Sequence, residues 1–201
     1  MVKKKKEKQS SKRNTALLAI IIAFITVSSI LGYTMRDESN VVRYNNIQFT
    51  QSDNFWTANV FGNKLYFYNS PENFGSINIS DDAINAIINS RMFYMVFDPD
   101  EEDAYLSAID AVSSDFYNSF SSIPIFVQRA TTSENKAYAL PIADCKNATA
   151  YVPVIDFKSS NQTRVYLQGS CIIADSENAL DILRIRDKLL FVVFYEIGKQ
   201  R

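Results

Sequence analysis

The chain has no histidine among its 201 residues. Without an imidazole group, Ser-His-Asp and Cys-His catalysis, histidine metal sites and the usual pH switch near neutrality are excluded. Internal repeats and low-complexity segments are also absent beyond a basic run at the N-terminus. Two of the commonest kinds of hydrolytic site therefore have no basis in this sequence.

Cysteine is nearly absent, with only Cys145 and Cys171. Their spacing does not fit a redox Cys-x-x-Cys motif, and two cysteines are too few for a structural zinc site. In an oxidising compartment an even pair favours a disulfide, which would add about 3–4 kcal/mol by constraining the unfolded chain. The alternative is two buried free thiols.

An excess of positive charge is confined to residues 1–14, where seven basic side chains and one Glu give a charge of +6. Because the whole chain carries −1, the remainder carries −7. Nucleic-acid phosphates require a basic face, so an acidic body argues against a nucleic-acid partner.

Charged residues are also missing between Arg13 and Arg36, where the chain is mostly apolar. About 21 residues at 1.5 Å each cross a hydrocarbon core of roughly 30 Å, which predicts a transmembrane helix at 15–35. The basic tail 1–14 is expected to stay in the cytoplasm and to attract anionic lipid headgroups of the bilayer. A cleaved secretory signal has the same layout, but its apolar core is ordinarily only about 7–15 residues long. We therefore expect a single-pass signal anchor in the cell membrane, with the C-terminal domain outside.

Beyond the anchor, residues 36–44 are predicted to form a tether and 45–201 one exterior α/β domain. Aromatic and β-branched residues between Asn45 and Ser80 predict antiparallel strands. Gly62-Asn63 is expected to be the turn of a β-hairpin between 55–61 and 64–68. Ser80, Asp81 or Asp82 can cap a short helix that follows.

The clearest predicted unit runs from 92 to 128. Met92–Phe97 is an apolar strand, Asp98-Pro99 opens a helix, and Ile123–Gln128 is a second strand. The helix repeats apolar residues at spacings of three and four, at Tyr105, Ile109, Val112, Phe116 and Phe120. These lengths predict a βαβ unit with parallel strands.

The last third of the chain predicts further strands at Tyr138–Ile142, Tyr151–Phe157, Thr163–Gln168 and Cys171–Ala174. A C-terminal helix follows, capped by Asp175 or Ser176, and its apolar run Leu189–Tyr195 is expected to be buried against the sheet. The predicted fold class is thus mixed α/β.

Asp98 and Asp100 are candidate metal ligands, because carboxylate oxygens suit Mg²⁺ or Ca²⁺. An apolar strand that ends in Asp-x-Asp resembles the first motif of haloacid-dehalogenase-type phosphohydrolases, and the resemblance implies a Mg²⁺ site. The small residue and the Thr or Val of that motif are replaced by Glu101, Glu102 and Asp103. The alternative is that Asp98 caps the helix, Pro99 is its first residue and the acids complement the helix dipole.

Aromatic residues concentrate in the hairpin region, where Trp56, Tyr66 and Tyr68 are a candidate binding face for a sugar or a protein. Alternate residues of a strand face the core, so about half of these rings are structural. Asn78, Asn147 and Asn161 begin Asn-x-Ser/Thr sequons, which are candidate glycosylation sites in an exterior domain.

The segments CKNAT, VPVIDF and NQTRVYLQGSCII, followed by a capped helix, resemble small single-pass membrane proteins of archaea that have no assigned function. Cys145 and Cys171 match the pattern, so the resemblance implies a disulfide between them. It implies no activity.

No catalytic set is complete, so a non-enzymatic role is favoured. We expect a membrane-anchored exterior domain that engages another envelope protein or a second copy of itself, with no cofactor. The alternatives are an exterior domain that binds sugar or a metal ion, Mg²⁺ or Ca²⁺, and then a Mg²⁺-dependent enzyme related to the phosphohydrolases.

Overall fold

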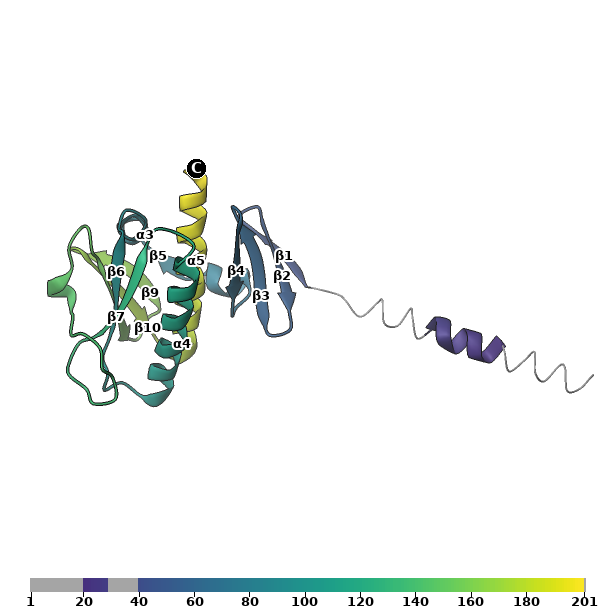
Figure 1. Cartoon of the computed structure of the whole chain (residues 1–201), viewed down its shortest axis with the longest axis horizontal. Coiled ribbons are helices and arrows are strands. Elements are labelled where there is room, and N and C mark those ends of the chain that lie inside the picture. Colours follow the sequence, from purple (N-terminus) through teal and green to yellow (C-terminus); the bar gives the residue numbers. More distant parts are fainter. Residues whose placement is uncertain (1–19, 29–39, 201) are drawn as a thin grey trace, which may run out of the picture. The chain divides into compact units, whose positions relative to one another are not determined.

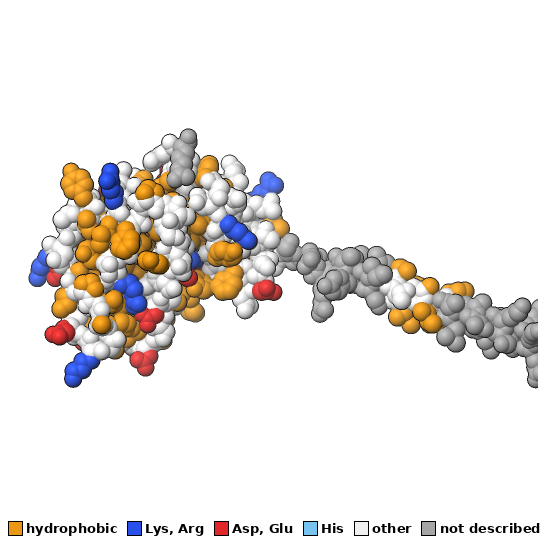
Figure 2. All heavy atoms as spheres, in the orientation of Figure 1, with side chains coloured by type: hydrophobic (Ala, Val, Ile, Leu, Met, Phe, Trp, Pro, Cys, Tyr) orange, Lys and Arg blue, Asp and Glu red, His pale blue; other side chains and the backbone are white. Residues whose placement is uncertain are grey.

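The structure, a computed structural model, describes residues 20–28 and 40–200. The chain forms two compact units, Met1–Asn40 and Val41–Arg201. In the first unit residues 20–28 are helical, and their side chains are mainly apolar (Figure 2). Within the described residues no helix has the length and apolar character needed to cross a membrane. The predicted span 15–35 extends beyond residues 20–28, and the predicted basic tail lies wholly outside the described residues.

The second unit begins with a four-stranded antiparallel sheet, the small sheet. Its strands are adjacent in chain order: β1 (Val41–Tyr44), β2 (Ile47–Ser52), β3 (Phe55–Val60) and β4 (Asn63–Phe67). β1 lies in the segment predicted to be a tether. The globular unit therefore starts at Val41 rather than Asn45, because Val41–Tyr44 pair with β2.

Two turns of the small sheet have left-handed backbone conformations. Asn45 and Asn46 have φ of 47° and 63°, and Phe61 and Gly62 have φ of 47° and 89°. Positive φ at both central residues is typical of the type I′ turn of β-hairpins. The predicted hairpin is present, but its turn is Phe61-Gly62 rather than Gly62-Asn63.

Two short helices, α2 (Pro71–Gly75) and α3 (Asp81–Ile88), and the short strand β5 (Asn78–Ile79) connect the small sheet to the rest of the unit. Ser80 is the N-cap of α3, and its hydroxyl accepts a hydrogen bond from the backbone N–H of Ala83. This predicted cap is confirmed.

The large sheet has the strand order β5-β9-β10-β8-β6-β7. Its longer strands are β6 (Met92–Phe97), β7 (Phe126–Thr131), β8 (Val154–Ser159), β9 (Arg164–Gln168) and β10 (Cys171–Ser176). β7, β6, β8 and β10 are parallel, whereas β9 is antiparallel to β10. Adjacent parallel strands β6 and β7 are joined by α4 (Asp103–Phe120) as predicted. The mixed α/β class is confirmed.

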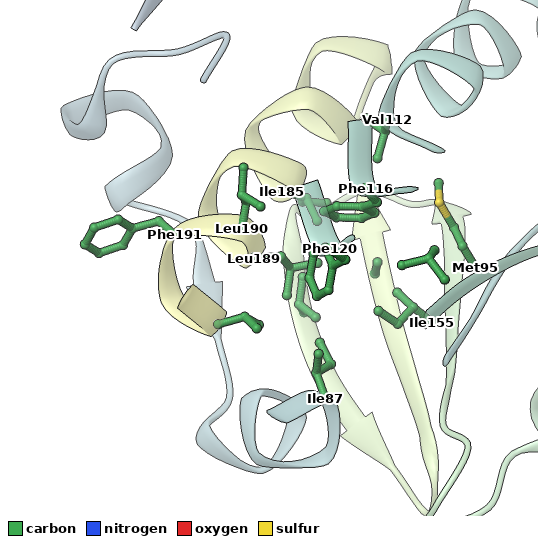
Figure 3. Packing of buried hydrophobic residues seen from close by; sticks show 14 of the residues in the cluster. Ile87, Met95, Val112, Phe116, Phe120, Ile155, Ile185, Leu189, Leu190 and Phe191 are labelled. Carbon is green, nitrogen blue, oxygen red and sulfur yellow. The ribbon is translucent and has the colours of Figure 1, made fainter. Parts of the chain in front are cut away.

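Helices α4 and α5 (Ala179–Lys199) pack together between the two sheets (Figure 1). Phe191 and Leu189 point to different sides of α5 (Figure 3). The Phe191 ring lies 5.7 Å from the Phe49 ring of the small sheet, and Leu189 is buried in the same cluster. This double packing uses the apolar character on nearly all sides of α5. The predicted burial of Leu189–Tyr195 is confirmed for the residues that are at most 1% exposed: Leu189, Leu190, Phe191, Val193 and Phe194.

The other face of the large sheet carries a second, smaller apolar cluster, and no α-helix of the described residues contributes to it. Val96, Val154 and Ile173 of the sheet pack there with Ala143 and with the partly buried Ala148. The last two residues belong to the long connection between β7 and β8, which contains the short 3-10 helix η1 (Cys145–Asn147). This connection, residues 132–153, is hereafter the cover segment.

Strand boundaries differ from the prediction in two places. β7 covers Phe126–Thr131 rather than Ile123–Gln128, because Ile123 and Ile125 are buried in the turn after α4. The predicted strand Tyr138–Ile142 is reduced to isolated bridges, and its Pro141 has no N–H to donate to a sheet. The strands predicted at 151–157, 163–168 and 171–174 are present with shifted ends.

Helix starts also differ. α4 begins at Asp103 with Glu102 as its N-cap, so the prediction that Asp98 caps it and Pro99 opens it is wrong. α5 begins at Ala179 with Asn178 as its N-cap, because β10 continues through Ser176.

Candidate functional site

A cleft of about 400 Å³ lies between the end of the small sheet and α4. β4 is the edge strand of that sheet, and its last residues bring aromatic rings to the cleft. The apolar lining is Phe55, Tyr66, Phe67 and Tyr68, and the polar lining is Asp115, Asn118 and Ser119 of α4 with Arg186 of α5. Phe55 and Tyr66 are 45% and 51% exposed, so their rings are available to a ligand. This aromatic cleft is the strongest candidate binding site.

Arg186 forms the floor of the charged part of the aromatic cleft and is only 3% exposed. Its Nη1 donates to the backbone carbonyl of Tyr66 at 2.6 Å and to Asp187 Oδ1 at 2.8 Å. Its Nη2 lies 3.6 Å from Asp115 Oδ2, and its guanidinium carbon lies 5.3 Å from the centroid of the Tyr68 ring. Nε has no hydrogen-bond partner among the described residues. Arg186 thus joins α5 to the edge strand β4, and its Nε–H is left without a partner among the described residues.

Asp187 is fully buried beneath this arginine. Its Oδ2 accepts hydrogen bonds from the backbone N–H of Asn69 at 2.8 Å and from Asn69 Nδ2 at 2.9 Å. Burial raises the pKa of the Asp187 carboxyl, and Arg186 and Asn69 oppose that shift. One guanidinium is therefore shared by two carboxyl groups, Asp115 and Asp187.

Tyr68 closes the network by donating its hydroxyl hydrogen to Asp115 Oδ2 at 2.5 Å. Burial, followed by this hydrogen bond, raises the pKa of Tyr68 to about 12. The phenol is therefore protonated at neutral pH, and Asp115 is held as an acceptor between Tyr68 and Arg186.

The three aromatic residues predicted as a binding face do not lie together. Tyr66 and Tyr68 alternate with the buried Phe67 and both line the cleft. Trp56 is paired with Phe67 in the sheet register and packs against the main core. Trp56 therefore faces the interior, and Phe55 takes its place beside Tyr68, at 5.6 Å between ring centroids.

Asp98 and Asp100 are exposed in the turn between β6 and α4. Asp98 Oδ1 accepts the backbone N–H of Asp100 at 3.0 Å, and Asp100 Oδ1 accepts from Asn135 Nδ2 at 3.0 Å. These carboxylates thus fasten the turn and attach it to the cover segment. Among the described residues, Asp98 and Asp100 belong to no cluster of three or more possible metal ligands, so this arrangement adds nothing to the resemblance to the phosphohydrolases.

A hollow of about 470 Å³ lies near the carboxyl ends of the parallel strands. Its acidic lining residues are Glu101, Glu102 and Glu177, and neither Asp98 nor Asp100 lines it. No basic side chain contributes to the lining, so a phosphate group would meet only negative charge there. This hollow does not suit a phosphorylated substrate.

Cys145 and Cys171 form a disulfide, with 5.2 Å between their Cα atoms, so the predicted bridge is confirmed. Asp156 lies against it: Oδ2 is 3.5 Å from Cys145 Sγ and 3.0 Å from Lys158 Nζ. The two sulfurs and an Asp156 oxygen all lie within 4.8 Å of one another. Because the sulfurs are bonded to each other, they are not thiolate ligands, and this group is not a metal site.

The three sequon asparagines are all exposed. Asn78 lies in β5, Asn161 lies in the turn between β8 and β9, and Asn147 is at the end of η1. Asn147 Oδ1 accepts the backbone N–H of Asp144 at 2.8 Å. Glycosylation at these positions stays a prediction.

No local pattern in the sequence predicts the polar wall of the aromatic cleft. Asp115 and Asn118 lie on the polar face of an ordinary amphipathic helix, and Arg186 is one of several charged residues in α5. Asp156 lies within a predicted apolar strand. The feature of the sequence that could have identified it is a charged residue within VPVIDF, at a position where an apolar residue is expected.

No family model matches the chain, and no curated protein or solved structure is significantly similar to it.

Proposed function

We propose that this protein is a membrane-anchored domain, facing the outside of the cell, that binds a carbohydrate in its aromatic cleft. The observation that carries the proposal is the convergence of exposed aromatic rings and of carboxylate, amide and hydroxyl groups on one cleft of about 400 Å³. Binding sites for small ligands combine an apolar lining with a few convergent polar groups in this way.

The two walls of the cleft match the two kinds of surface that a sugar has. The C–H faces of a pyranose ring are apolar and pack on aromatic rings such as Tyr66 and Phe55. Its hydroxyl groups need donors and acceptors, which Asp115, Asn118 and Ser119 supply from the opposite wall. A flat apolar ligand would leave those polar groups unpaired, which is costly once water is excluded.

The charge of the cleft favours a neutral ligand. Arg186 is the basic residue in its lining, and its guanidinium already serves Asp187 and Asp115. An incoming carboxylate or phosphate would compete with these two acids and would approach Asp115 directly. We therefore assign neutral rather than acidic sugars to the site.

The anchor part of the proposal rests on residues 15–35 together with the basic tail. Successive residues of a helix are 100° apart, so the consecutive apolar residues of 20–28 place apolar side chains on every side of this helix. A helix surrounded by lipid needs such a surface, whereas a helix that packs on a soluble core needs only one apolar face. Thr26, a polar residue of this helix, donates its hydroxyl hydrogen to the carbonyls of Ile22 and Ala23 at 3.0 and 2.9 Å. A threonine satisfied in this way is compatible with a hydrocarbon environment.

The full-length protein in detergent, applied to an array of neutral and acidic oligosaccharides, tests the function. Tyr66→Ala should weaken binding of the best neutral ligand by about tenfold, because a stacking ring is lost. Tyr117→Ala is the matched control: Tyr117 is 59% exposed on α4, next to Asn118, but does not line the cleft. Absence of binding to any sugar, or equal loss in both variants, would overturn the proposal.

A protein-interaction role in envelope assembly is the second candidate. Tyr117 and Phe126, which is 51% exposed, line a hollow of about 330 Å³ beside the edge strand β7. Exposed aromatic residues beside the edge strand of a sheet are common in protein interfaces. Photo-crosslinking from position 126 in intact membranes tests this role. Recovery of another envelope protein or of a second copy supports it, and absence of any protein adduct contradicts it.

A further inference from the structure

The Cys145–Cys171 disulfide joins the cover segment to the face of the large sheet that carries the smaller apolar cluster. Cys171 is the first residue of β10 and is 2% exposed. Cys145 begins η1 on the surface side and is only partly buried. The two sulfurs therefore differ in access, and an external reactant would reach Cys145 first.

Asp156 occupies a position where the fold calls for an apolar residue. In the sheet register it lies between Val96 of β6 and Ile173 of β10, and both of these belong to the smaller apolar cluster. Asp156 is nevertheless 3% exposed, and its Oδ1 has no hydrogen-bond partner among the described residues. A buried carboxyl group with one unpaired oxygen destabilises a fold compared with an apolar residue of similar size, even when its other oxygen pairs with a lysine, as Oδ2 does with Lys158 at 3.0 Å. Stability therefore gives no reason for an acid at this place.

The position of the carboxyl group does suggest a chemical reason. Oδ2 lies 3.5 Å from Cys145 Sγ, and an Asp156 oxygen lies within 4.8 Å of both sulfurs. A carboxyl group that lies this near both sulfurs can give a proton to the sulfur that leaves the disulfide and can take it back when the bond re-forms. We propose that Cys145, Cys171 and Asp156 form a site of thiol–disulfide exchange that accepts a dithiol as its co-substrate.

The reaction balances with a dithiol as reductant. A thiolate of the dithiol attacks Cys145 Sγ, which forms a mixed disulfide and breaks the bond to Cys171 Sγ. The Cys171 sulfur leaves with the electron pair and takes the proton of Asp156, because a thiolate is unfavourable among apolar side chains. The second thiol of the co-substrate gives its proton to the Asp156 carboxylate and attacks the mixed disulfide at the co-substrate sulfur. Cys145 leaves as a thiolate and takes from water the proton that the first thiol had lost to it. The co-substrate thus loses two electrons and two protons, the protein gains both, and the reverse reaction uses the same groups.

Several charged groups act on Asp156. Burial is the largest influence and raises the pKa of its carboxyl. The Lys158 ammonium on the same strand lowers it, and Asp144 of the cover segment and Asp98 after β6 raise it. In turn, the Asp156 carboxylate adds to the effect of burial, which is the main cause of the raised pKa of Tyr105 on α4. A raised pKa increases the fraction of Asp156 that carries a transferable proton near neutral pH.

The test uses the full-length oxidised protein in detergent and dithiothreitol as the dithiol. The rate of reduction, divided by the concentration of dithiothreitol thiolate, is measured from pH 5 to pH 9 in wild type and in Asp156→Asn. At low pH the wild-type disulfide should be reduced about tenfold faster, or more, than that of the variant. This difference in rate should disappear as the pH rises and Asp156 loses its proton. The variant should show no such pH dependence.

Asp175→Asn is the matched control. Asp175 is a buried acid of β10 on the same sheet face, 7% exposed and paired with Arg164 at 3.1 Å, and it is bonded to neither sulfur. Its replacement should leave the rate profile unchanged. Equal profiles in wild type and Asp156→Asn, or equal changes in both variants, would overturn the proposal.

A second measurement does not depend on a variant. The folded wild-type protein is treated briefly with glutathione, quenched with acid and digested for mass spectrometry. The proposal requires a glutathione adduct on Cys145. Adducts mainly on Cys171, or adducts that form only after denaturation, would contradict it.

Discussion

Tyr68 donates a hydrogen bond to Asp115 across 2.5 Å and thereby joins the end of β4 to the middle of α4. The two residues are 47 positions apart in the chain. The aromatic wall and the polar wall of the cleft meet at this bond, so the shape of the candidate site depends on it.

Replacement of Tyr68 by Phe removes this hydrogen bond and keeps the ring. A hydrogen bond to a partly buried carboxylate stabilises a fold by about 1–2 kcal/mol, and the free energy of unfolding should fall by that amount. Urea unfolding followed by circular dichroism measures it. Tyr117→Phe, at an exposed position on the same helix, should change stability little; an equal loss in both variants would show that the Asp115 bond is not responsible.

Gly198 is required because Phe61 packs on it. A Cβ atom at position 198 would lie 2.6 Å from the Cβ of Phe61 and 2.2 Å from its Cδ2. Gly198→Ala should therefore destabilise the protein by about 1–3 kcal/mol, despite the better helix propensity of alanine. In a Phe61→Gly background the same change should be neutral or stabilising, and thermal unfolding of the four proteins gives the coupling. Additive effects would contradict the contact.

Stability at high pH should depend on two tyrosines. Burial is the main cause that raises the pKa of both Tyr68 and Tyr105 from 10.0 to about 12. The unfolded chain loses these protons first, so their contribution is complete below pH 10 and is lost between pH 10 and pH 12. The free energy of unfolding should fall less steeply over this range in Tyr105→Phe than in wild type. Tyr151→Phe, at an 83% exposed position, should retain the wild-type slope; a wild-type slope in Tyr105→Phe would contradict the assignment.

Loss of the disulfide should weaken the cover segment and the whole domain. Replacement of both Cys145 and Cys171 by Ala opens a loop with a sequence separation of 26 residues, which costs about 3–4 kcal/mol in the chain-entropy description. Hydrogen exchange should rise first in residues 132–153, because the disulfide is what ties this segment covalently to β10. Uniform protection of the cover segment in the double variant would show that its apolar contacts alone hold it.

Local signals were sufficient for much of the fold. The Ser80 cap, the aromatic hairpin and the unit from β6 to β7 each depend on patterns within a short stretch of chain, and all three are present. The first and last residues of the strands were less predictable, because an apolar residue can be buried in a turn as well as in a strand. Ile123 and Ile125 are buried in a turn, and Ser176 continues a strand in which its hydroxyl donates to Tyr105 at 3.0 Å.

The candidate site was predictable only in part. Alternation along β4 placed Tyr66 and Tyr68 on one face, and the same rule should have excluded Trp56, which pairs with Phe67 on the other face. The partners of Tyr66 and Tyr68 could not be found, because Asp115 and Arg186 meet them only through the packing of α4 and α5 against the edge of the small sheet. A pairing of that kind has no counterpart in local sequence.

The central claim is that residues 41–201 form an oxidised domain outside a membrane in which the chain is anchored. Intact cells are treated with a membrane-impermeant maleimide, with and without a prior impermeant phosphine reductant, and the mass of the full-length protein is followed. The account predicts labelling of Cys145 and Cys171 in intact cells only after reduction. Labelling only after lysis, and without any reductant, would place free thiols in the cytoplasm and contradict the account.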